Sequence, residues 1–198
     1  MPIKGIVESG SQEMLSAFAQ ENDISFIVFA TPTTIEEGIY GNALREHGIP
    51  SSQIIEQACP GLPDAISNDD SGKLAHKLMS DFVPMALKQF SSVPQNLVAF
   101  LGCTHYGYQA DMFERSLQAL VPKARVLNPN QGSVDSILSR FDNEPGDGRL
   151  TIEFITRYVI PEVVINSLSV YIGEKAPGTL SALKSFTHLP ELCGDLPR

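Results

Sequence analysis

Short apolar runs alternate along the chain with amphipathic stretches. Four runs predict buried strands, and they cover residues 24–30, 54–58, 96–100 and 124–127. Their apolar character is nearly continuous, which is typical of strands in a sheet that is covered on both faces. Between the runs, apolar residues recur at the spacing of a helix. Strands that alternate with helices predict an α/β fold with a doubly wound, mostly parallel sheet.

Local signals indicate where the first elements begin and end. Residues 3–8 form an apolar segment with room for one brief strand, and Ser9 with Gln12 fits a capping box for the first helix. A second helix, continuing to about residue 47, has two candidate capping boxes: Thr33 with Glu36, and Thr34 with Glu37. Two prolines and a glycine predict a shaped loop, rather than a helix or strand, over residues 59–64.

The later part of the chain divides into two regions. Further helices are predicted over residues 73–90, with a kink at Pro84, and over residues 109–120, 133–141 and 161–171. A polar loop covers residues 142–148, and residues 150–158 alternate enough for a strand. We therefore expect one complete α/β domain, residues 1–141, followed by a C-terminal segment, residues 142–198, made of a strand, a helix and a tail.

Composition and charge exclude several classes of partner. The 198-residue chain has a net charge of −9 and a pI of about 4.8, and it carries no basic stripe, so neither nucleic acid nor an anionic membrane is an expected partner. The start of the chain has no signal-peptide pattern, and no apolar run approaches the length of a membrane span. The three cysteines are irregularly spaced, so we expect a cytoplasmic protein with reduced thiols.

Polar residues follow three of the predicted strands, at residues 31–34, 59–64 and 103–106. Ligands of open α/β sheets bind outside the carboxyl ends of the strands, and parallel strands would gather these three turns at one edge. Cys103 is there a candidate base or nucleophile, and His105 stands two residues on. Backbone N–H groups and a nearby imidazole predict a thiol with a lowered pKa.

Simpler interpretations of Cys103 are open as well. A free cysteine usually behaves as a small, buried, apolar residue. A zinc site of the Cys-x-His type is disfavoured, because the usual ligand spacings are absent, and no metal is expected. The threonines at residues 31–34 are explained equally well by helix capping.

Three motifs stand in a specific order and spacing. They are Ala30-Thr31-Pro32-Thr33-Thr34 with Tyr40, Ala58-Cys59-Pro60, and Leu101-Gly102-Cys103-Thr104-His105-Tyr106. On these motifs the chain resembles the aspartate/glutamate racemase family, and within it glutamate racemases most closely. The resemblance covers about residues 2–141 well and the tail weakly. It implies a racemase-like fold and interconversion of L- and D-glutamate, without a cofactor, for peptidoglycan.

The resemblance also implies roles for individual residues. In this family one cysteine thiolate removes the α-proton of the substrate, and a second cysteine thiol delivers a proton to the opposite face, as racemisation requires. By motif Cys103 is the second of these cysteines, and His105 assists proton transfer at Cys103. Thr104 would bind the substrate carboxylate, and Thr34 matches a threonine that contacts the substrate.

The chain departs from the family pattern at several points. The Asp-Ser-Gly, Pro-Tyr-Gly and Cys-Asn-Thr motifs of the family's first domain are absent, and the first catalytic cysteine with them. Ser67 stands where many members have a glutamate, and Asn128-Pro129-Asn130 replaces a frequent aspartate. The C-terminal segment resembles the part of the family chain that returns to complete the first domain.

Three functions remain open from the sequence. The first is a truncated racemase chain, the second a non-catalytic α/β binding or interaction domain derived from the family, and the third, least favoured, an unrelated cysteine enzyme. We expect the C-terminal segment to lack its apolar partner and to promote self-association into a homo-oligomer. The residues concerned are Ile152, Phe154, Ile155, Val163, Val164 and Leu168.

Overall fold

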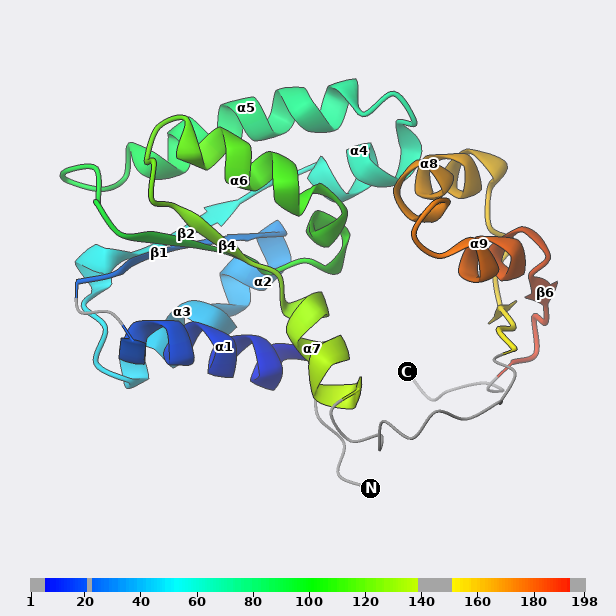
Figure 1. Cartoon of the computed structure of the whole chain (residues 1–198), viewed down its shortest axis with the longest axis horizontal. Coiled ribbons are helices and arrows are strands. Elements are labelled where there is room, and N and C mark those ends of the chain that lie inside the picture. The colour runs from blue at the N-terminus through cyan, green and yellow to red at the C-terminus, as the bar shows by residue number, and fades with distance from the viewer. Residues whose placement is uncertain (1–5, 21–22, 139–150, 193–198) are drawn as a thin grey trace.

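A four-stranded parallel sheet forms the centre of the molecule (Figure 1). The computed structural model describes residues 6–20, 23–138 and 151–192. The strands are β1 (Ser25–Ala30), β2 (Ile54–Ala58), β3 (Leu97–Leu101) and β4 (Arg125–Leu127), in the order β2-β1-β3-β4. All three strand pairings are parallel, which confirms the predicted sheet.

Helices cover both faces of this sheet (Figure 1). On one face lie α4 (Leu62–Asn68), α5 (Lys73–Leu87) and α6 (Ala110–Gln118); on the other lie α1 (Ile6–Gln20), α2 (Pro32–Glu37), α3 (Ile39–Glu46) and α7 (Pro129–Leu138). Ile27 and Phe29 of β1 enter the first core, while Phe26 and Val28 enter the second. Burial on both faces explains the continuous apolar runs and confirms the doubly wound fold.

The start of the described chain is helical, not extended. Residues 6–8, predicted as the end of a strand, form the first turn of α1, so Ser9 lies inside this helix and does not cap it. The strand prediction was wrong because Val7 continues the helical stripe of Gly10 and Met14, and both Val7 and Met14 pack into the core under β3. Residues 3–5 lie outside the described residues.

The helix after β1 begins two or three residues earlier than predicted. Thr31, in extended conformation, is the N-cap of α2, and its Oγ1 accepts a hydrogen bond from the Thr34 N–H at 3.3 Å. Pro32 occupies the first turn, where its missing N–H costs nothing, so the capping position moves to the residue before it. Gly38, with φ 62°, separates α2 from α3, and the predicted single helix is therefore two.

Thr31 and Thr33 are expected to differ sharply when each is replaced by alanine. Thr31→Ala removes the capping oxygen and should lower the free energy of unfolding by about 0.5–2 kcal/mol. Thr33 is exposed, and Thr33→Ala should change it by less than about 0.5 kcal/mol. Urea denaturation of both variants measures the difference. Equal losses would contradict the capping role of Thr31.

A short helix also stands where the sequence predicted part of a loop. Residues 62–68 form α4, which begins after Gly61 at φ 75°. Leu62, Ala65 and Ile66 are buried and follow the three-to-four-residue helical repeat, so tertiary packing outweighs the turn-forming prolines and glycine.

The C-terminal segment forms a small unit beside the carboxyl edge of the sheet (Figure 1). The strand predicted over residues 150–158 shrinks to β5 (Ile155–Thr156), which pairs in parallel with β6 (Thr187–His188) and not with the main sheet. The predicted helix is α8 (Glu162–Ile172), and α9 (Pro177–Lys184) was not predicted. The expected domain boundary at residue 141 lies outside the described residues.

Helix α8 joins this unit to the main domain. The Ser167 hydroxyl, fully buried, donates to the Ile66 carbonyl of α4 at 3.2 Å, and Gln109 Nε2 donates to the Tyr171 hydroxyl at 2.7 Å. Four of the apolar residues that were expected to lack a partner are exposed: Ile152, Phe154, Ile155 and Val163. Two others, Val164 and Leu168, line a cavity between α8 and the main domain.

Candidate active site

The switch point of the sheet, where open α/β sheets typically have their crevice, lies at the carboxyl ends of β1 and β3. The chain leaves β1 for β2 on one side and later returns to β3 on the other, so the loops after β1 and β3 diverge at this point. The Gly102 N–H donates to the Phe29 carbonyl at 2.8 Å, and a Cβ on Gly102 would lie 3.0 Å from that of Ala30. The turns at residues 31–34, 59–64 and 103–106 thus share one edge, as predicted.

Cys103 and His105 are in contact at this edge. Cys103 is the last extended residue after β3, and the 3₁₀ helix η2 (Thr104–Gln109) begins directly after it. The Cys103 Sγ lies 3.7 Å from the His105 Nδ1, and the backbone N–H groups of His105 and Tyr106 act to lower the pKa of the same thiol. A half-buried thiol beside an imidazole and two backbone donors is an arrangement that can exchange protons.

The structure reverses the expected direction of the Cys103 pKa. Burial raises the pKa of the thiol above its ordinary value, and the two backbone N–H groups offset only part of that rise. The thiolate loses water here and gains too few donors to compensate. The pKa of Tyr40 is also raised, mainly by burial and to a smaller extent by the negative charge of the Cys103 thiolate.

Alkylation of Cys103 should therefore rise with pH to a midpoint above the ~8.5 of a free thiol. The neutral thiol is the folded protein's dominant form at pH 7, so the reaction accelerates only as the thiolate forms. Iodoacetamide labelling followed by peptide-resolved mass spectrometry distinguishes Cys103 from Cys59 and Cys193. A midpoint below 8.5 would show that the imidazole and the backbone donors outweigh burial.

Cys59 lies in the core and not in the crevice. Its side chain is fully buried, the thiol donates to the Gln57 carbonyl at 3.6 Å, and the Tyr106 hydroxyl donates to the Cys59 carbonyl at 3.3 Å. Burial, and then the charge of Cys103, raise the pKa of this thiol far above its ordinary value. Cys59 is thus a packing residue, in line with its Cys-Pro turn.

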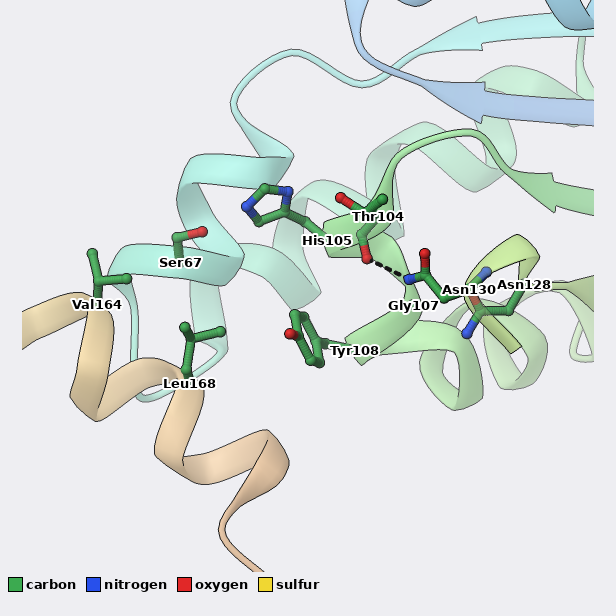
Figure 2. A pocket seen from close by; sticks show the side chains of 9 residues that line it. All are labelled: Ser67, Thr104, His105, Gly107, Tyr108, Asn128, Asn130, Val164 and Leu168. Atoms are coloured by element: carbon green, nitrogen blue, oxygen red, sulfur yellow. Dashed lines mark hydrogen bonds between the residues drawn. The ribbon is translucent and has the colours of Figure 1, made fainter. Parts of the chain in front are cut away.

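A cavity of about 590 Å³ opens beside His105 (Figure 2). Thr104, His105 and Tyr108 enter it from η2, while Ser67 comes from α4, and Val164 and Leu168 of α8 form the facing wall. Asn128 and Asn130 complete the lining. In the described part of the chain, this lining offers hydroxyl, amide and imidazole groups but no carboxylate, which suits an anionic ligand.

The residues predicted for the site are only partly brought together. Cys103, Thr104 and His105 are adjacent, but only Thr104 and His105 line this cavity. Cys103 and Thr34 do not, and the Thr34 hydroxyl is paired with that of Thr31 at 2.9 Å. Asn128 and Asn130 were noted from the sequence only because they stand where the family often has an aspartate, and they were not predicted as site residues. They follow β4, so the rule that identified the other polar strand ends would also have identified them.

The described residues form neither a metal site nor a membrane-spanning helix. Within residues 6–20, 23–138 and 151–192, no group of three histidine, cysteine or acidic side chains is placed to hold a metal ion. Across the same ranges, each helix is too short or too polar to cross a bilayer.

Comparison with curated proteins confirms the resemblance to glutamate racemases. The chain is 36% identical over 124 residues to a glutamate racemase of Ruegeria pomeroyi, and 31% identical over 118 residues to one of Ruegeria sp. (strain TM1040). These alignments cover 61% and 60% of this chain but 43% and 41% of the relatives. The chain therefore spans about two fifths of the length of the curated relatives it matches. No protein-family model matches it.

Solved structures confirm the racemase-like fold. Glutamate racemase from Aquifex pyrophilus superposes with a TM-score of 0.56 at 21% identity, covering 87% of this chain and 61% of that one. The enzyme from Francisella tularensis, in complex with D-glutamate, gives a TM-score of 0.58 at 16% identity, covering 84% and 58%. Both alignments cover more of this chain than the sequence matches do.

Proposed function

We propose that this chain carries the Cys103 half-site of a cofactor-independent amino-acid racemase, with glutamate as its substrate. The observation that best supports this proposal is the contact between the Cys103 Sγ and the His105 Nδ1, 3.7 Å apart, at the carboxyl ends of β1 and β3. The similarity to glutamate racemases supports the reaction and the substrate. A cytoplasmic role in supplying D-glutamate for peptidoglycan is part of the proposal and rests on the resemblance alone.

The proposed chemistry is a proton transfer at the α-carbon. The Cys103 thiolate takes the α-proton as the C–H bond breaks and the S–H bond forms, and the electron pair is left on the α-carbon and its carboxylate. His105 accepts or returns the thiol proton, and Thr104 holds the substrate carboxylate. Thr34 is retained as a substrate contact from the neighbouring strand end, although it does not line the described cavity.

Inversion requires a second acid or base on the opposite face of the α-carbon. Cys59 is unsuited to this role because it is fully buried. The facing wall of the described cavity consists of Val164 and Leu168, which carry no titratable group. We accordingly propose a half-site in residues 1–141, with residues 142–198 as a segment that completes another part of the assembled enzyme.

The same apolar wall favours the second candidate, a non-catalytic binding domain that holds an amino acid without moving its proton. Solvent exchange at the α-carbon separates the two functions. The chain is incubated in D₂O with L- or D-glutamate, and deuterium uptake is followed by NMR for the wild type and for Cys103→Ala. Uptake that depends on Cys103 supports the racemase half-site, and glutamate binding without such uptake supports the binding domain.

Self-association is also part of the proposal. Ile155, Val159 and Val170 are each about half exposed or more, and they belong to the C-terminal unit, so association would remove apolar surface from water. We expect a mass above the 21.5 kDa of one chain in light scattering as the protein concentration rises. Val170→Asp should weaken the association, and a constant monomer mass would contradict it.

A further inference from the structure

We infer that Asn130 is a positioning residue for Cys103 and acts through the Thr104–His105 peptide unit. The inference extends the proposed function, and its relevance to catalysis rests on that function. Asn130 Nδ2 donates to the Thr104 carbonyl at 2.8 Å, the contact drawn in Figure 2. The nitrogen of that same peptide unit belongs to His105, whose Nδ1 lies 3.7 Å from the Cys103 Sγ and whose N–H acts to lower the pKa of the Cys103 thiol.

Asn130 is therefore linked, through a single peptide unit, to the residue whose imidazole contacts the sulfur. A donor on the carbonyl oxygen of a peptide polarises it and strengthens its N–H as a donor on the other side. Asn130 also fixes the orientation of this peptide plane, from which the His105 side chain departs toward Sγ. Both effects favour the thiolate, and they act against the desolvation that otherwise disfavours it.

Asn130 is itself held in place from two sides. The Asn128 Oδ1 accepts from the Asn130 N–H at 3.2 Å, which ties the end of β4 to the start of α7. Gly107 of η2 lets the amide approach closely, because a Cβ there would lie only 2.7 Å from Asn130 Nδ2. This close packing of Gly107 against Asn130 holds η2 and α7 in fixed contact.

The test is the pH profile of Cys103 alkylation, which needs neither substrate nor turnover. In Asn130→Ala the midpoint should rise by about half a unit, so that labelling at pH 7 becomes about threefold slower. Asn130→Asp should raise it further, because a carboxylate repels the thiolate. Gly107→Ala, which displaces the amide without removing it, should shift the midpoint in the same direction. Asn42→Asp adds the same charge beside Arg45 on α3 and should leave it unchanged.

These outcomes separate the inference from the proposed function. Midpoints that stay at the wild-type value in Asn130→Ala and Gly107→Ala, with unchanged near-ultraviolet circular dichroism, would overturn the positioning role. An equal shift in Asn42→Asp would overturn it too, because it would show a general charge effect. A shift confined to the Asn130 and Gly107 variants supports the role, even if the chain exchanges no glutamate proton and the racemase proposal fails.

Discussion

Glutamate incubated with the 198-residue chain in D₂O should take up deuterium at the α-carbon of one enantiomer much faster than either enantiomer inverts. Cys103 approaches the α-carbon from one face, so it can remove a proton there and return a deuteron to the same face. The configuration is then retained. Inversion needs delivery to the other face, and the cavity beside His105 has only the apolar Val164 and Leu168 on its wall opposite η2. Loss of one acid or base partner typically slows such a step by roughly 10²–10⁴-fold.

Cys103→Ala should abolish the exchange, whereas Thr33→Ala, on an exposed position of α2, should preserve it. The exchange should also accelerate with rising pH, because the raised pKa of Cys103 leaves little thiolate at neutrality. NMR follows the deuterium and circular dichroism follows the inversion in the same samples. Inversion as fast as exchange, and lost in Cys103→Ala, would reveal a second proton-transfer group and refute the half-site.

Leu101→Ala should be among the most destabilising single substitutions in this fold. Leu101 is the last residue of β3, fully buried in the core under α4, α5 and α6. Truncation leaves a cavity in addition to the lost burial, and such substitutions cost about 2–5 kcal/mol. For a chain of this size the midpoint of thermal unfolding should fall by roughly 4–20 °C.

Leu120 provides the matched control, because its side chain is 52% exposed in the turn after α6. Leu120→Ala should change the free energy of unfolding by less than about 0.5 kcal/mol. Differential scanning calorimetry of the two variants gives the comparison directly. Similar losses for both would mean that the core between the sheet and α4, α5 and α6 is not packed as the structure has it.

The strands were predictable because one physical cause produces their pattern. Burial on both faces demands continuous apolar character, and β1, β2 and β3 fall within one or two residues of their predicted positions. Their shared polar edge followed from the parallel pairing alone. Residues 6–8 were misassigned because so short an apolar segment fits a strand or a helix equally well, and only the packing of Val7 decides between them.

Other features depend on contacts that no local pattern encodes. The cap at Thr31 depends on the position of Pro32, and β5 is short because its partner β6 has only two residues. The proximity of Cys103 and His105 was predictable from their spacing, but the direction of the Cys103 pKa was not. That direction is set by how deeply the surrounding turns bury the thiol, which is a property of the assembled domain.

The pairing of β1 with β3 also determines when the site can form during refolding. Ser25 lies opposite Leu97, so β2, α2, α3, α4 and α5 all belong to the loop that this pairing closes. Closing a long loop costs chain entropy before its contacts repay it, and non-local pairings are slow to form. Local helices can form in microseconds, but Cys103 should stay open to alkylation until these two strands meet. Its protection from alkylation would therefore report when β1 and β3 pair during refolding.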